Sequence, residues 1–145
     1  MARQDFAYFH TLRVRWAEVD MQGIVFNGHY LTYFDVAFTE YWRTAGLPNI
    51  FLQTEEGREM FARKATIEYH SPAHFDDLVD VGVRCASLGR SSVRFVLEIY
   101  RGEEYLISGE LLYVYADTTV RKGVPLPEEW RTTMIQFEKT PPVTS

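Results

Sequence analysis

The chain has 145 residues, of which 46% are hydrophobic and 24% are charged, as expected for one packed globular domain rather than a disordered segment. Its formal net charge of −5 argues against a general nucleic-acid-binding protein, which normally carries a basic face. A phosphate-bearing small molecule is not excluded, because a few clustered Arg and Lys side chains suffice to bind it.

The cysteine content and the hydropathy pattern bear on the compartment. The single cysteine, Cys85, excludes an intramolecular disulfide and favours a reducing environment. The N-terminal residues lack the continuous apolar stretch of a secretory signal, and no run approaches the roughly 18 apolar residues of a membrane helix. The sequence therefore predicts a cytoplasmic protein without a membrane span.

In chain order, the first predicted element is a strand with alternating faces, one of which carries His10, Leu12, Val14 and Trp16. Residues 28–45 are predicted to form one long helix, because apolar side chains recur every three or four positions and leave only a narrow polar ridge. A helix that is apolar nearly all round is typical of a protein core. Gly46 and Pro48 supply its stop.

The rest of the chain is predicted to be mostly strands. Three segments alternate with a period of two, at 61–70, 79–85 and 92–99, and residues 105–116 are predicted to form a further strand that is apolar on both faces over 111–115. The first of them is predicted to carry Phe61, Ala65, Ile67 and Tyr69 on one apolar face. Gly89 and Gly102 suit tight hairpins between the later strands. A short helix is predicted near 128–136, and residues 139–145 are predicted to be a flexible tail.

This order of elements predicts an α+β fold in a single domain that spans residues 1–145. About five antiparallel strands would wrap around one long central helix, because each layer must bury its apolar face against another. A sheet with a helix on only one face leaves a face and edges to be covered, so a dimer or a larger homo-oligomer is expected.

The segment between the first strand and the helix carries the candidate chemistry. Asp20 lies in the loop, Asn27 is a residue type that caps helices, and Gly28 permits close approach of another molecule. The start of a helix has unpaired N–H groups and a positive dipole end, so it can polarise a carbonyl oxygen. A carboxylate beside such donors is the combination that acyl transfer needs.

This segment resembles the signature of hotdog-fold acyl-CoA thioesterases of the 4-hydroxybenzoyl-CoA thioesterase type. The motif that carries the resemblance consists of Asp20, Gly23, Val25, Phe26 and Tyr30. The aromatic-rich helix after the motif and the strand order extend the resemblance over about residues 8–120. It implies a hotdog fold and hydrolysis of an acyl-CoA thioester without a metal or other cofactor. It also implies a homodimer or homotetramer with active sites at subunit interfaces.

The resemblance implies roles for single residues. Asp20 falls on the catalytic carboxylate, as a nucleophile or as a general base on water. Asn27 falls on the residue whose backbone N–H faces the thioester oxygen. Many relatives have His where this chain has Asn27, and Asn where it has His29. The catalytic role of the family's His is therefore not transferred to His29, which is a weaker candidate than Asp20 and Asn27. Residues expected to line the substrate site are Gly23, Val25, Phe26, Gly28 and Tyr30.

Basic residues outside the motif are candidates for the phosphates of coenzyme A. Arg90, Arg121 and Lys122 resemble positions that the family uses for the nucleotide end. Arg63 and Lys64 form a further candidate pair.

Several alternatives remain open. A hotdog dehydratase or hydratase would use a His with a carboxylate, as His29 and Asp20 could provide, and a non-catalytic acyl-CoA-binding module would use the same aromatic cleft. The candidate ligands of a metal site would be His70, His74, Asp76 and Asp77. Such a site is disfavoured, because the two histidines flank a Ser-Pro turn and do not share a helix face. Cys85 is expected to be inert packing, and Ser91–Ser92 lacks the Gly-x-Ser-x-Gly elbow of serine hydrolases. The acyl group, aromatic or short to medium chain, stays undetermined.

Overall fold

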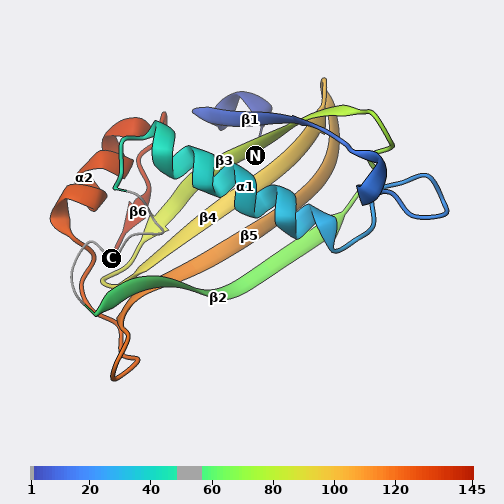
Figure 1. Cartoon of the computed structure of the whole chain (residues 1–145). Helices are drawn as coiled ribbons and strands as arrows, with labels where there is room; N and C mark the ends of the chain where they lie inside the picture. The colour runs from blue at the N-terminus through green and yellow to red at the C-terminus, as the bar shows by residue number, and fades with distance from the viewer. Residues whose placement is uncertain (1, 49–56) are drawn as a thin grey trace.

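The structure is a computed structural model that describes residues 2–48 and 57–145. In the described residues, one curved sheet has the strand order β1-β3-β4-β5-β2, and every pairing along this order is antiparallel. The long helix α1 lies across the concave face of the sheet (Figure 1). The elements are β1 Tyr8–Arg13, α1 His29–Thr44, β2 Arg58–Tyr69, β3 Leu78–Leu88, β4 Ser92–Arg101, β5 Glu104–Asp117, α2 Glu128–Phe137 and β6 Val143–Thr144.

The core lies between α1 and the inner face of the sheet. Phe38 of α1 stacks on Tyr113 of β5 with ring centroids 4.5 Å apart, and it meets Phe95 of β4 edge-on at 4.8 Å. Phe34 approaches the sheet at Gly109, where a Cβ atom would lie 2.5 Å from its ring. The predicted buried helix and the sheet around it are thus observed, and α2 confirms the short helix predicted near 128–136.

Cys85 lies on the inner face of β3 and is fully buried. Burial, together with the nearby Glu138 carboxylate, raises the pKa of its thiol to about 12, so the thiol is unreactive at neutral pH. Neither helix of the described chain combines the length and the apolar character that crossing a bilayer requires.

The first strand is shorter than predicted. β1 ends at Arg13, which pairs with Leu78, the first residue of β3. Beyond it, the Val14 amide donates to the Asp77 carbonyl, and the Val14 carbonyl accepts from the Asp76 amide. Trp16 begins a 3-10 turn, Trp16–Glu18, and is itself 74% exposed. The prediction that Trp16 shares the apolar strand face is wrong, because the neighbouring strand starts too late to pair with it.

The apolar face predicted for β2 is interrupted by a bulge. The register against β5 shifts between Ala62 and Lys64, so Phe61 pairs with Val114 while Ala65 pairs with Leu111. Since side chains alternate along β5, Val114 and Leu111 face opposite sides of the sheet, and so do Phe61 and Ala65. Phe61 therefore points away from α1, to the outer face, and is 42% exposed.

The end of the chain is not the flexible tail that the sequence predicts. Val143 and Thr144 form β6, which pairs in parallel with Ser87 and Leu88 of β3, and the Ser145 amide donates to the Leu88 carbonyl at 3.1 Å. β1 covers β3 only as far as Val83, so the remaining edge of β3 is available to β6.

Candidate active site

Asp20 begins a tight turn that precedes α1. Its N–H donates to the Ile24 carbonyl at 3.0 Å, and its carbonyl accepts from the Gly23 amide at 3.0 Å. Gly23 has φ +77, a left-handed conformation that explains the glycine of the motif. The exposed Asp20 carboxylate accepts from the Gln22 amide at 2.8 Å, which fixes its Oδ1 above the turn.

The base of the turn is bonded to a distant part of the chain. Val19 pairs with Val25, which closes the turn, and Ile24 forms an isolated bridge with His74. The Val25 amide donates to the Ala73 carbonyl at 2.9 Å, and Val25 is 1% exposed. The turn therefore rests on the connection between β2 and β3, residues 70–77.

Glu18, two residues before Asp20, is a buried carboxylate with complete hydrogen bonding. It accepts from the Arg15 amide and the Tyr33 hydroxyl, each at 2.8 Å, and pairs with the Arg15 guanidinium at 2.8 Å. Burial opposes ionisation, but the hydrogen bonds from Arg15 and Tyr33 and the charge of Arg15 outweigh it, so the pKa of Glu18 is lowered. Glu18 thus attaches the chain before Asp20 to α1.

The start of α1 has no side-chain cap within the described residues. The N-cap position is Gly28, and Asn27 lies one residue earlier in the turn, so the prediction that Asn27 caps the helix is wrong. The first amides of a helix have no partner inside it, and the helix dipole makes this end positive. The amide of His29, the first residue of α1, donates to the Phe26 carbonyl at 2.9 Å, so an oxygen atom of a ligand would be received by the other amides of this first turn.

A pocket of about 230 Å³ opens beside this helix start. Its walls come from the Asp20 turn, from the start of α1, from the end of β2 with the turn after it, and from β5. The lining residues are Ile24, Val25, Asn27, Tyr30, Tyr69, His70, Ser71, Pro72 and Ile107. Asp20 is not itself in the wall, but its backbone is bonded to Ile24, which is.

Two tyrosines hold the helix start in place. Tyr30 is 2% exposed, and its hydroxyl oxygen accepts from the Ala73 amide at 3.0 Å, while burial raises its pKa. The Tyr69 hydroxyl donates to the Asn27 carbonyl at 3.2 Å, and its ring lies 5.7 Å from that of Tyr30. The ring of His29 packs edge-on against Phe26 at 5.9 Å.

The candidate basic residues gather at the opposite end of the sheet. A cleft of about 1010 Å³ on the outer face is lined by Phe61, Arg63 and Arg121, together with parts of β4 and β5. Arg90 lies at its edge, 3.5 Å from the carbonyl of Gly123 in the cleft wall. Lys122 follows Arg121 in the same exposed turn, and Lys64, paired with Leu112, also faces outward.

The two sites are far apart within one chain. Along β2, Arg63 lines the cleft and Tyr69 lines the small pocket, so at their nearest six residues, or roughly 20 Å at 3.3 Å per residue, separate them. In Figure 1 the loop before α1 and the turn after β5 project from opposite ends of the sheet.

The family pattern described as the thioesterase superfamily matches residues 22–108, more than half of the chain. The chain belongs to the thioesterase superfamily. The resemblance of the motif and the predicted enzyme class, thioester hydrolase, are confirmed at this level. The matched residues begin at 22, so the match does not cover Asp20.

Relatives of this thioesterase agree with the assignment. The acyl-CoA thioester hydrolase YbgC of Escherichia coli O6:H1 is 30% identical over 119 residues, which cover 81% of this chain and 87% of YbgC. A solved hypothetical protein from Aquifex aeolicus superposes with a TM-score of 0.79 at 25% identity, covering 88% of this chain and 98% of that one. Slr0204, a 1,4-dihydroxy-2-naphthoyl-CoA thioesterase from Synechocystis, reaches a TM-score of 0.80 at 21% identity, covering 88% and 94%. The predicted hotdog fold is confirmed.

The two histidines of the disfavoured metal site, His70 and His74, have separate partners in this thioesterase. His70 stacks on Tyr105 and lies 2.9 Å from the Ser108 hydroxyl, whereas His74 neighbours Asp77. Across residues 2–48 and 57–145, no group of three or more His, Cys, Asp or Glu side chains is placed to hold a metal ion.

Three features of the site were missed from the sequence. In the sequence, Glu18 looks like an ordinary acidic residue of a loop, and Tyr69 looks like an apolar residue of a strand. The connection 70–77 looks like a turn without a further role. No local pattern predicts that this connection supports a turn about fifty residues earlier in the chain.

Proposed function

We propose that this thioesterase hydrolyses acyl-CoA thioesters, with Asp20 as the catalytic carboxylate and the amides at the start of α1 polarising the thioester carbonyl. The observation that carries the proposal is the pocket beside an uncapped helix start, with Asp20 bonded through its backbone to the pocket wall. The names of relatives such as YbgC support acyl-CoA as the substrate class.

The pocket supports a small acyl group. Its volume of about 230 Å³ exceeds the roughly 150 Å³ of an apolar cavity that binds benzene, and its walls include two tyrosine rings. A single aromatic ring or a short acyl chain fits this space. A medium chain would extend beyond it.

Two hydrolytic routes fit the geometry. Asp20 could attack the thioester carbonyl, forming a mixed anhydride and releasing the thiolate of coenzyme A, after which water would cleave the anhydride. Alternatively, Asp20 could take a proton from water as the water attacks. In either route the developing oxyanion would be stabilised by the helix amides, at about 2.7–4 kcal/mol for one well-placed donor.

The outer-face cleft is proposed as the site for the phosphates of coenzyme A, with Arg63 and Arg121 in its walls and Arg90 and Lys122 beside it. Because roughly 20 Å of strand separates it from the pocket in one chain, the substrate is proposed to use two copies. β2 is an edge strand with mostly exposed side chains. Antiparallel pairing of two β2 strands would bring the cleft end of one copy beside the pocket end of the other. We therefore propose a homodimer, or a tetramer of such dimers. The compartment proposed for it is the cytoplasm, as the sequence predicts.

The test is a thiol-release assay over a panel of aryl, short-chain and long-chain acyl-CoAs. Wild type is expected to release free coenzyme A from small acyl thioesters, and Asp20→Asn is expected to bind them with little turnover. Wild-type protein that binds acyl-CoA but never releases thiol would identify a binding module. Dehydration or hydration of the acyl chain without thiol release would identify the hydratase alternative.

A further inference from the structure

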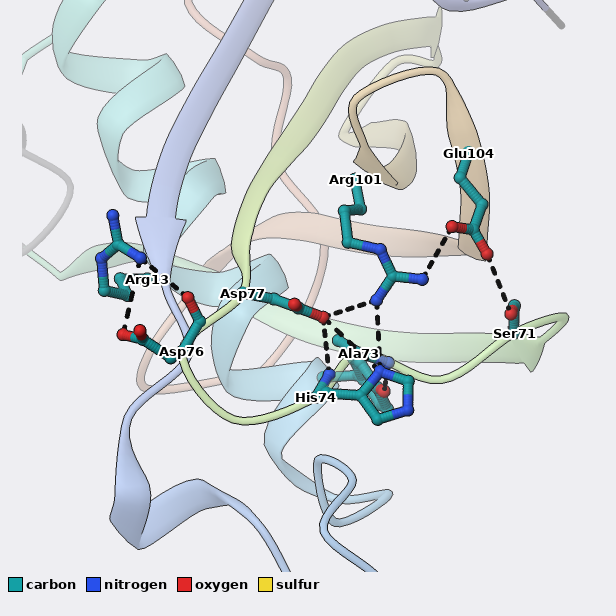
Figure 2. Close-up of polar contacts among 9 residues, drawn as sticks. Arg13, Ser71, Ala73, His74, Asp76, Asp77, Arg101 and Glu104 are labelled. Carbon is teal, nitrogen blue, oxygen red and sulfur yellow. Dashed lines mark hydrogen bonds and ion pairs between the residues drawn. The ribbon is translucent and has the colours of Figure 1, made fainter.

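The connection between β2 and β3, residues 70–77, is held by a polar network that the reaction does not use directly. Figure 2 shows the network between this connection and the hairpin of β4 and β5. Arg101, the last residue of β4, donates to Asp77 Oδ2 at 2.5 Å and to Glu104 Oε1 at 2.7 Å. Asp77 Oδ2 also accepts from the His74 amide at 2.8 Å.

The same connection supports the Asp20 turn. The Ala73 carbonyl accepts from the Val25 amide at 2.9 Å, and His74 bridges Ile24. The Ala73 amide donates to the Tyr30 hydroxyl at 3.0 Å. A continuous chain of bonds thus runs from Arg101 through Asp77 to the residues that close the turn.

The ion pair is placed to be persistent. The side chains of Asp77 and Arg101 are only 21% and 28% exposed. Burial opposes ionisation of Asp77, but hydrogen bonds from the His74 amide and from Arg101 outweigh it and hold the pKa of the carboxyl below its usual value. A second contact fixes the neighbouring residue: Arg13 donates to the carbonyl of Asp76 at 2.7 Å, where the backbone has the left-handed φ of 68.

We propose that the Arg101–Asp77 pair is a positioning element for Asp20: it fixes the 70–77 connection, the connection fixes the Ile24–Val25 segment, and this segment sets where the Asp20 carboxylate stands relative to the start of α1. The catalytic part of this inference rests on the proposed role of Asp20. The mechanical part, that the pair holds the turn in place, does not.

The matched control is the ion pair of Arg3 with Asp80, which lies three residues after Asp77, within β3. Asp80 accepts from Arg3 at 2.7 Å and from Thr11 at 2.6 Å, with 26% of its side chain exposed. It resembles Asp77 in bonding and burial, but it ties β3 to β1 and to the N-terminal segment. Asp77→Asn and Asp80→Asn therefore remove comparable charges, and only the first is linked to the Asp20 turn.

Amide hydrogen exchange of peptides covering residues 19–26 tests the mechanical part without any activity. Asp77→Asn is expected to speed exchange of the Val25 amide by about 10-fold or more, because the acceptor segment becomes mobile. Asp80→Asn is expected to leave it unchanged. Equal exchange in the wild type and both variants would overturn the proposal.

Steady-state kinetics test the catalytic part. Asp77→Asn and Arg101→Gln are expected to lower kcat by about 10-fold with KM changed less than about 3-fold, since misplacing a reacting group by about 1 Å can cost up to about 10²-fold. Arg101→Lys, which keeps the charge, is expected to recover part of the loss, and Asp80→Asn to stay within about 2-fold of wild type. Faster exchange with unchanged kcat would overturn the link to Asp20. A wild type without thioesterase activity would refute the proposed function, whereas exchange alone would still decide whether the pair holds the turn.

Discussion

The two ends of the sheet differ in size, charge and rigidity. At the start of α1, a pocket of about 230 Å³ is bounded by tyrosine rings and by a backbone turn with many hydrogen bonds. At the far end, a cleft of about 1010 Å³ is lined by two exposed arginines and one glutamate, Arg63, Arg121 and Glu59, and opens on the outer face. Such a difference suits a substrate with a small reacting group on a large charged carrier. The position of the reacting group must be precise, whereas that of the carrier need not be.

The largest expected effect separates two aspartates with the same local structure. Asp20 and Asp117 each accept a backbone amide two residues later at 2.8 Å, but they lie at opposite ends of the sheet. Asp20→Asn is expected to lower kcat by about 10²–10⁴-fold, the range for loss of a general base. Asp117→Asn is expected to leave kcat within about 2-fold, since Asp117 ends β5 on the side of the sheet away from the pocket. Thiol release under saturating acyl-CoA measures both, and equal losses would break the comparison.

The next effect concerns the stability of the pocket end. Because the pKa of Glu18 is lowered, its hydrogen bonds stabilise the folded state above the ordinary carboxyl pKa of 4.5, and this stabilisation is lost as pH falls through the lowered value. Glu18→Gln is expected to reduce the free energy of unfolding at pH 7 by about 1–3 kcal/mol. Urea unfolding should show the difference from wild type shrinking at pH values below 4.5. Glu110→Gln, in the half-exposed ion pair with Arg94, should cost only about 0–1 kcal/mol. A loss for Glu18→Gln that is independent of pH would contradict the assignment.

A third prediction addresses the cleft. Removing both charges with Arg63→Gln and Arg121→Gln is expected to raise KM for acyl-CoA by about 10-fold at low salt, with kcat unchanged, because solvent-exposed charge pairs contribute modestly and are screened by salt. Acyl-pantetheine, which lacks the nucleotide, should show no change in KM. Arg94→Gln, on the outer face but outside the cleft wall, is the control. A fall in kcat with acyl-pantetheine would show that the two ends are not independent.

The smallest expected effect concerns the choice of acyl group. Tyr69 and Phe61 are aromatic residues of the same strand, 50% and 42% exposed, but Tyr69 lines the pocket and Phe61 lines the cleft. Tyr69→Ala is expected to raise the ratio of kcat/KM for longer over shorter acyl chains by about 5-fold, because one methylene in an apolar pocket is worth about 1–3 kcal/mol at most. Phe61→Ala should leave this ratio unchanged. If both variants shifted the ratio alike, the pocket would not be the acyl site.

The elements with regular side-chain periodicity were predictable from the sequence. The 16-residue α1 and four of the strands follow from repeats of three to four and of two, because burial of one face imposes those periods. Departures from regularity were not predictable. The bulge that reverses Phe61 is visible only against the partner strand, and the end of β1 before Trp16 depends on where β3 begins.

The candidate site was predictable only where its residues are close in the chain. The motif from Asp20 to Tyr30 placed the turn and the helix start together, although the expected side-chain cap at Asn27 is absent from the described structure. The support of the turn by Ala73, His74 and Asp77, and the separation of the arginines from Asp20, depend on sheet pairing between distant segments. Such pairings are set by the whole fold rather than by any window of sequence.

The close approach of Phe34 to Gly109 has a consequence for assembly of the chain. Along the inward row of β5, the neighbours of Gly109 are Ile107 and Leu111, both large and buried. If β5 slipped by two residues, one of these side chains would occupy the space of the Phe34 ring, and the helix could not seat. The absence of a side chain at Gly109 thus makes docking of α1 depend on the register of β5. A sheet with the wrong register keeps its inner face exposed, so its strands can separate and pair again.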